Sequence, residues 1–302
     1  MSNLLPRCEF LLQCIFRQQL RCPHCGSDKC SVVARKHIVT RIRECAECKL
    51  YFTDPIYRPL LSSNFYDVLY GGEGLTTRLP AEKELRRLIE TDFALSDKCF
   101  HARIDAIRSL APSARLLEIG SSWGYFLQQW NRRGKHAVGI EISDRRRSFG
   151  VNKLKVEMVK DFESLGKICF DVIYTAHTLE HFTDLSTIFP TIYDHLASNG
   201  ALVIEVPNFA YRERGADILS LIGAVHPLGF SRRFFETALP KHGLKVCAFF
   251  DSWDSFPHGP SPAVQDGVPD NIICLARKSD VSCASRRSGP GSWPDMRGIA
   301  SC

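Results

Sequence analysis

A chain of 302 residues is long enough for one large domain with a smaller module beside it, and its 44% hydrophobic content excludes a largely disordered protein. The net charge of +6 is unevenly placed: residues 1–60 carry ten Lys or Arg against five Asp or Glu, whereas residues 61–276 carry a net charge of −2. The charge therefore argues against nucleic acid as a partner of the central region.

The first twenty residues contain apolar stretches that Arg7, Glu9 and Arg17 interrupt, and no small-residue cleavage site follows. This pattern predicts a short amphipathic helix and not a signal peptide. No run in the chain reaches the roughly 18 apolar residues of a membrane span. Without an export signal, the 13 cysteines favour metal ligands or buried thiols over disulfides, and we expect a cytoplasmic protein.

Four of the cysteines form two pairs, Cys22 and Cys25 in CPHC and Cys45 and Cys48 in CAEC, with 19 residues between the pairs. This spacing is typical of a zinc ribbon, in which two tight turns bring four thiolates into a tetrahedron. Since cysteine fills all four positions, the predicted zinc is structural; the alternative is four buried free thiols. We expect residues 1–60 to form an N-terminal helix and this ribbon.

The next stretch, residues 61–110, is predicted to be a helical linker and lid, because residues 81–110 carry apolar side chains at helical intervals after Pro80. Residues 111–277 then alternate between strand and helix. Strands are expected at 115–119, 136–142, 155–159, 170–176, 201–206, 244–250 and 271–277, and helices at 123–134, 143–154, 185–200 and 231–239.

Alternation of this kind predicts an α/β, Rossmann-like, doubly wound fold with a mostly parallel seven-stranded sheet. The last two strands lack a helix between them and should form an antiparallel hairpin at the sheet edge. Residues 278–302, rich in Ser, Gly, Pro and Arg, are expected to be a disordered tail.

A glycine turn follows the first of these strands, in LLEIGSSWGYF. Gly120 and Gly124 bracket Ser122, Glu118 ends the strand, and Glu141 ends the next strand 21 residues after Gly120. A carboxylate at the second position suits the hydroxyls of a ribose, but the missing middle glycine argues against a dinucleotide pyrophosphate. The carboxylate of a ligand with an amino-acid end would still be stabilised by the N-terminus of the following helix, and Glu118 could face the ammonium group of that ligand. These features indicate S-adenosylmethionine.

With these residues the chain resembles the class I S-adenosylmethionine-dependent methyltransferases over about residues 115–277, with Ser122 where the family has glycine. The resemblance implies that Glu141 binds the ribose, that Asp161 lies near the adenine amino group, and that GALVIEVPN is the fifth strand of that fold. The alternatives are glycines that serve only helix packing, and an NAD site.

The stretch TAHTLEHF, residues 175–182, lies just past the fourth strand. Its His177, Glu180 and His181 are similar to the HxLEH motif of many small-molecule methyltransferases, which implies an acceptor site here. Methyl transfer needs aligned reactants and a group that accepts a proton, for which histidine is suited. We predict His181 as the base or acceptor contact and Glu180 as its orienting partner. Alternatively His177 faces the cofactor and His181 only fills space. A metallopeptidase reading of His-x-x-Glu-His would require a helix.

Residues 208–229 form a long insertion that we expect to cap the cleft, with Tyr211, Arg212 and His226 as candidate acceptor contacts. The alternative is a plain surface loop.

The stretches RECAECKLYFTDPIYRP and FYDVLYGG resemble the linker of bacterial methyltransferases that carry an N-terminal zinc segment and modify sugars, glycans or secondary metabolites; Lys49 stands where that group usually has glycine. The resemblance implies a sugar-like small-molecule acceptor, with transfer to oxygen favoured and transfer to carbon open. Two other hypotheses are an RNA methyltransferase that uses the basic ribbon and a non-catalytic binding protein with a degenerate fold.

Overall fold

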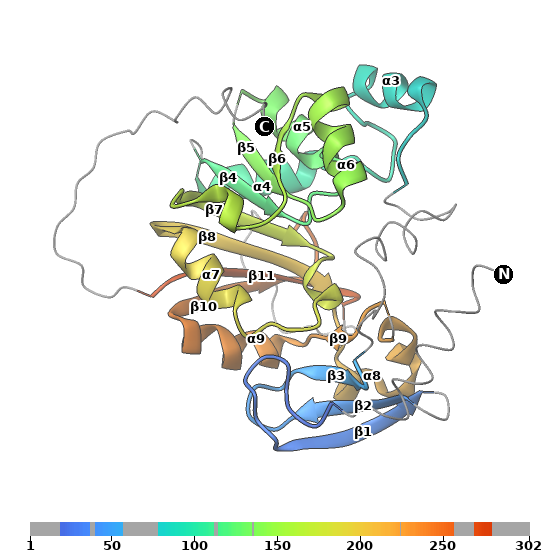
Figure 1. The fold of residues 1–302 in the computed structure, drawn as a ribbon, viewed down its shortest axis with the longest axis vertical. Coiled ribbons are helices and arrows are strands. Elements are labelled where there is room, and N and C mark those ends of the chain that lie inside the picture. Colours follow the sequence, from blue (N-terminus) through green and yellow to red (C-terminus); the bar gives the residue numbers. More distant parts are fainter. Residues whose placement is uncertain are drawn as a thin grey trace.

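The computed structural model describes residues 19–36, 40–56, 78–111, 114–134, 136–223, 225–256 and 269–279 (Figure 1). The amphipathic helix expected at the start of the chain, the linker residues 61–77 and the tail from residue 280 lie outside these residues.

The large sheet has seven strands in the order β10-β11-β8-β7-β4-β5-β6. The five strands from β8 to β6 are parallel, and β10 and β11 form the predicted antiparallel hairpin at the sheet edge; β11 also pairs antiparallel with β8. The strands are β4 (Leu116–Ile119), β5 (Ala137–Ile140), β6 (Glu157–Val159), β7 (Phe170–Ala176), β8 (Leu196–Pro207), β10 (Leu244–Phe250) and β11 (Asn271–Lys278).

Helices cover both faces of this sheet, because its central strands carry apolar side chains in both directions. Leu117 points into a core cluster with α7 (Ile188–His195) and α9 (Arg232–Ala238). Leu116 points into the opposite cluster with α3 (Glu82–Glu90), α4 (His101–Leu110) and α5 (Tyr125–Arg132). Figure 1 shows α5 and α6 (Asp144–Phe149) beside β5 and β6. Single turns connect these elements: η1 (Gly150–Leu154), η2 (Glu163–Leu165), η3 (Leu179–His181) and η5 (Leu239–His242).

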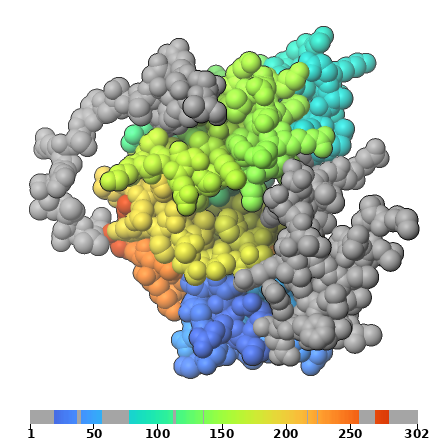
Figure 2. Space-filling model, in the orientation of Figure 1, coloured from blue at the N-terminus to red at the C-terminus, as the bar shows by residue number. Residues whose placement is uncertain are grey.

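A second, four-stranded sheet joins two distant parts of the chain in the order β1-β2-β3-β9. Its strands are β1 (Cys30–Lys36), β2 (Thr40–Cys45), β3 (Tyr51–Asp54) and β9 (Leu228–Gly229). The expected cap supplies β9, together with α8 (Tyr211–Arg214) and η4 (Gly215–Leu221). The blue β1–β3 segment therefore lies against the later part of the chain, as Figure 2 shows where it meets the yellow surface.

The helix predicted over 185–200 was wrong in its second half. The helix α7 ends at His195, and the residues from Leu196 onward belong to β8, where Leu196 pairs with Phe170. Gly200 is not a helix cap: a Cβ there would lie 2.8 Å from the Leu196 side chain, so close packing requires the glycine. In a sequence, a glycine needed for packing looks the same as one that ends a helix.

The continuous helical pattern predicted for residues 81–110 is also broken. Residues 91–100 separate α3 from α4, and three of them, Asp92, Phe93 and Leu95, have positive φ. Phe93 is fully buried, with its ring 6.2 Å from that of Trp123. Burial of this aromatic side chain stabilises the interruption, which helical periodicity alone does not reveal.

Candidate active site

The turn after β4 is built from the two glycines and the serine between them. Gly120 has φ 81° and Gly124 has φ 84°, and a Cβ would lie 2.1 Å from Thr178 Oγ1 at the first position and 2.7 Å from Val156 Cγ2 at the second. Ser122 has a left-handed φ of 51°. The backbone therefore follows the path of a three-glycine turn even where a serine replaces the middle glycine.

A cavity of about 560 Å³ opens at the carboxyl ends of β4 and β7. It is lined by Asp97, Lys98, Phe100, Arg103, Glu118, Gly120, Ser122, Tyr125, Tyr174, Ala176, His177, Glu180, His181, Val225 and His226. Ligands of open α/β sheets bind at this edge. Residues of the glycine turn, of the HTLEHF block (residues 177–182) and of the cap therefore line the same cavity, which is large enough for a small ligand.

Glu118 lies in this wall and has the environment of a cation-binding carboxylate. It is 7% exposed, and its Oε2 atom has no hydrogen-bond partner in the described part of the chain. Burial raises its pKa to about 8, with Glu141 contributing, although Ser121 opposes the change. A positively charged ligand group beside it would restore the ionised form.

Glu141 follows β5 directly, and its Oε1 accepts a hydrogen bond of 2.8 Å from the backbone N–H of Ser143. Burial raises its pKa, whereas the backbone N–H groups of Ser143 and Ser122 lower it, so the carboxylate reaches the glycine turn. It does not line the cavity itself. Asp161 follows β6, and its Oδ1 accepts from Ser164 N at 3.0 Å and Ser164 Oγ at 2.7 Å, also outside the cavity lining.

The HTLEHF block leaves β7 through the single turn η3, not through the long helix that a metallopeptidase reading requires. His177, at φ 48°, lies between two carboxylates: its Nδ1 is 3.6 Å from Glu180 Oε1 and its Nε2 is 3.7 Å from Glu205 Oε1. Burial lowers its pKa, but the two carboxylates outweigh burial and raise the pKa to about 9. His177 is therefore a cation at neutral pH.

His181 has the opposite environment. Burial, together with His226, lowers its pKa, although Glu180 raises it. Its Nδ1 lies 2.9 Å from the carbonyl oxygen of Val225, and its ring packs edge-on against that of His226 with 4.5 Å between the ring centroids. His181 is therefore uncharged at neutral pH and in contact with the cap.

Of the three candidate acceptor contacts, only His226 lines the cavity. The Tyr211 hydroxyl donates to the Val33 carbonyl at 3.1 Å, and the Arg212 guanidinium binds the Glu44 carboxylate, with Nε–Oε1 at 3.2 Å and Nη2–Oε2 at 2.5 Å. These two side chains hold the cap against the N-terminal sheet and do not face the cavity.

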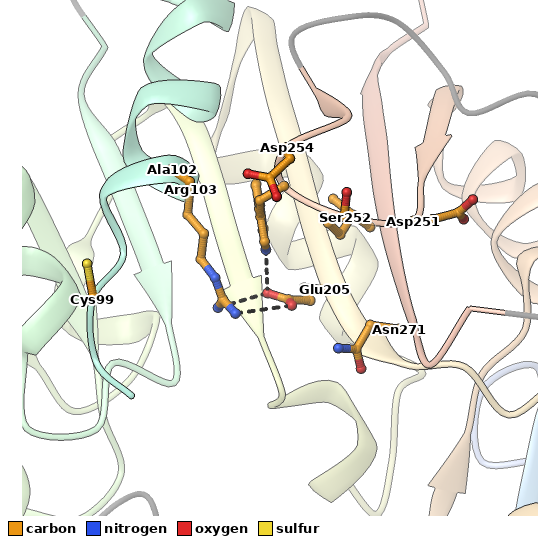
Figure 3. Close-up of a pocket in the computed structure, with 10 residues that line it drawn as sticks. Cys99, Ala102, Arg103, Glu205, Asp251, Ser252, Asp254 and Asn271 are labelled. Atoms are coloured by element: carbon orange, nitrogen blue, oxygen red, sulfur yellow. Dashed lines mark hydrogen bonds and ion pairs between the residues drawn. The ribbon is translucent and has the colours of Figure 1, made fainter. Parts of the chain in front are cut away.

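Sequence reasoning missed a group of residues beside the cavity. Arg103 reaches from α4 to Glu205 on β8, with Nη1–Oε2 at 2.9 Å, and the Trp253 indole donates to the same carboxylate at 3.1 Å (Figure 3). The Arg103 guanidinium also lies 4.4 Å from the Phe100 ring centroid. Glu205, charged within the apolar run ALVIEV, was the signal available in the sequence.

Arg103, Glu205 and Trp253 line a second cavity of about 390 Å³, and Arg103 also lines the first cavity. Its remaining lining comes from the start of α4 and the residues just before it, from the stretch after β10 and from the start of β11: Cys99, Ala102, Asp251, Ser252, Asp254, Asn271 and Ile273. Burial raises the pKa of Glu205, but His177 and Arg103 outweigh it, so the pKa is lowered and the carboxylate stays ionised. The second cavity therefore has an ionised carboxylate and other polar side chains in a wall that is otherwise apolar and includes the Trp253 ring.

The four predicted metal ligands converge. The sulfur atoms of Cys22, Cys25, Cys45 and Cys48 all lie within 4.8 Å of one another; the 22–48 pair is 3.5 Å apart and the 25–45 pair is 3.6 Å apart. Four sulfurs at the Zn–S distance of about 2.3 Å form a tetrahedron with edges of about 3.8 Å, so the donor set fits zinc. Lys49, in place of the usual glycine, has φ 64° and donates its backbone N–H to Cys45 O at 3.0 Å.

Comparison with known proteins identifies one family. A family model described as a methyltransferase domain matches residues 91–248, more than half of the chain. None of the curated proteins matches the sequence. None of the described helices is long and apolar enough to cross a membrane.

Similar solved structures include a TehB-like S-adenosylmethionine-dependent methyltransferase from Corynebacterium glutamicum, with 18% identity and a TM-score of 0.48, covering 66% of this chain and 97% of that chain. The CcbJ methyltransferase from Streptomyces caelestis has 13% identity and a TM-score of 0.49, and the match covers 62% of this chain and 98% of that chain. An S-adenosylmethionine-dependent methyltransferase from Clostridium acetobutylicum has 12% identity and a TM-score of 0.47, and the match covers 66% of this chain and 98% of that chain.

Proposed function

The chain belongs to the methyltransferase-domain family and is an S-adenosylmethionine-dependent methyltransferase, and from this premise we propose that it methylates a hydroxyl group of a small, sugar-like acceptor in the larger cavity. The observation that carries the proposal is the lining of that cavity. Glu118 and the glycine turn, which suit the cofactor, share it with His181 and His226, which suit an acceptor.

In the proposed complex Glu118 faces the ammonium group of the cofactor, Ser122 and the following helix N-terminus face its carboxylate, and Glu141 binds the ribose, with Asp161 near the adenine. One buried oxygen of Glu118 and the hydroxyl of Ser122 have no hydrogen-bond partner among the described residues, which supports these roles, because a buried polar atom is unfavourable until it is hydrogen-bonded.

The transfer is an in-line displacement. The acceptor oxygen forms a bond to the methyl carbon while the carbon–sulfur bond breaks, and the sulfur keeps the electron pair, giving S-adenosylhomocysteine. His181 takes the proton that the hydroxyl loses, and Glu180 orients the block. The second cavity, with Asp254 and Asn271 beside the Trp253 ring in its wall, supports a hydroxylated acceptor that extends past Arg103. Carbon methylation is the alternative outcome.

The cysteine cluster is proposed to hold a structural zinc ion, since no coordination position stays open for chemistry. RNA as the acceptor has less support, because Arg41 and Arg43 of the basic N-terminal module both bind the buried Asp54, at 2.9 and 2.8 Å.

The test is calorimetry of S-adenosylmethionine and S-adenosylhomocysteine with the full chain and with Glu141→Ala, followed by a methylation assay over a panel of sugars. We expect micromolar binding that the substitution weakens at least tenfold. A folded protein that binds neither compound would contradict the proposal. Methylation of RNA and not of sugars would show that the proposed acceptor is wrong.

A further inference from the structure

Three side chains in the wall of the larger cavity have the chemistry of a metal site. A carboxylate oxygen of Glu180 and one nitrogen from each of His181 and His226 lie within 4.8 Å of one another. Nitrogen and oxygen ligands about 2.1 Å from a metal ion lie roughly 3–3.5 Å apart, so small side-chain rotations would close this group around an ion.

Both imidazoles already have the outer hydrogen bond that metal-binding histidines use. His181 Nδ1 lies 2.9 Å from the carbonyl oxygen of Val225, and His226 Nδ1 lies 3.1 Å from that of Leu221. A backbone carbonyl only accepts hydrogen bonds, so each Nδ1 carries the hydrogen and each Nε2 carries the lone pair. Such a bond fixes the tautomer and the ring orientation of a metal ligand.

The carboxylate provides an independent observation. Glu180 is 2% exposed, and its Oε2 has no hydrogen-bond partner in the described ranges of the chain. Its other oxygen, Oε1, lies 3.6 Å from His177 Nδ1, which orients the carboxylate. A buried carboxylate oxygen that no donor satisfies, beside two oriented imidazoles, points to a bound cation.

We propose that Glu180, His181 and His226 bind a divalent first-row transition-metal ion, separate from the cysteine cluster, whose remaining coordination positions take oxygen atoms of the acceptor. Two histidines and one carboxylate occupy one side of such an ion and leave positions open toward the cavity. The acceptor part rests on the proposed function. His181 then gives its lone pair to the ion, and the acceptor hydroxyl, acidified by the ion, releases its proton to water.

The experiment uses the full chain with its cysteine site loaded with zinc. We titrate it with Co²⁺, and follow binding by calorimetry and by the visible absorption of the cobalt ion. We expect one Co²⁺ per chain, bound at micromolar concentration without a thiolate charge-transfer band. Glu180→Gln and His226→Ala should each weaken this binding at least tenfold. His136→Ala, which removes a histidine paired with Glu157 outside the cavity, should bind as wild type does.

Thermal melting of each variant shows whether it folds. If Glu180→Gln does not fold, His226→Ala still tests the site. Absence of Co²⁺ binding by the zinc-loaded wild type, or unchanged binding by His226→Ala, would overturn the metal site. S-adenosylmethionine binding is measured on the same samples without Co²⁺. Cofactor binding without Co²⁺ binding rejects the metal site and leaves His181 as the base, whereas Co²⁺ binding without cofactor binding rejects the proposed function alone.

Discussion

The buried carboxyl group of Glu118 predicts that cofactor binding is linked to proton release. With a pKa of about 8, roughly nine in ten Glu118 side chains carry a proton at pH 7. The ammonium group that we propose lies beside Glu118 requires the ionised form, so about one proton should leave for each S-adenosylmethionine bound. The affinity should then rise about tenfold between pH 6 and pH 7, and level off near pH 8.

Calorimetry at pH 6.5 in two buffers with different ionisation enthalpies measures the released protons directly. Glu118→Gln cannot ionise, so it should bind the cofactor at least tenfold more weakly at pH 8 and release no proton. Glu90→Gln, at an exposed position on α3, is the matched control and should behave as wild type does. Affinity that is independent of pH between 6 and 7, with no proton released by wild type, would refute the reasoning.

The same carboxyl group affects the stability of the ligand-free protein. Its pKa in the folded state is raised from 4.5 to about 8, so its protonated form favours folding below pH 4.5, and this contribution is lost as the pH rises through 8. At pH 7 the loss is about 3 kcal/mol, an upper bound on the gain from Glu118→Gln because glutamine also buries a polar group. The free-energy difference of unfolding between the variant and wild type should increase from pH 5 to pH 8. A constant difference would contradict the buried, protonated state.

Three further predictions concern other parts of the molecule. Ser122→Gly relieves a left-handed backbone and should raise the free energy of unfolding in urea by about 0.5–1 kcal/mol; a decrease would mean that the hydroxyl matters more than the backbone. Asp54→Asn leaves Arg41 and Arg43 without their buried carboxylate and should lower the free energy of unfolding by about 3–5 kcal/mol. A loss below about 1 kcal/mol would show that these two ion pairs are not needed for stability. Removal of the proposed zinc from the cysteine cluster with a chelator should speed amide exchange at least tenfold in both β3 and β9, because these strands share a sheet; unchanged exchange in β9 would show that the cluster does not stabilise that strand.

The parallel direction of the central strands and the antiparallel edge hairpin were predictable from local pattern. The run FDVIYTA is a strand over the predicted residues, because a buried parallel strand is apolar on both faces. The helix predicted from residue 143 begins with Ser143 as its N-cap, whose hydroxyl accepts from Arg146 N. These features depend on residues close together in the sequence.

The rest depends on contacts between distant residues. The interruption at Phe93 follows from packing against Trp123, and the early end of α7 follows from the pairing of Leu196 with Phe170. Tyr211 and Arg212 had the chemistry of acceptor contacts, but their partners Val33 and Glu44 are 178 and 168 positions earlier in the chain. Pattern reasoning finds which side chains can bind; the direction in which they point is set by tertiary packing.

The pairing of β3 with β9 has a consequence for anyone who wants to redesign this enzyme. The loop that brings Val225 and His226 to the cavity continues directly into β9, whose partner strand begins six residues after Cys45. A graft of a foreign acceptor loop would have to match the edge of a sheet encoded by residues 30–54. A chimera should therefore exchange the two segments together, and deletion of residues 19–56 would remove a support of the cavity wall.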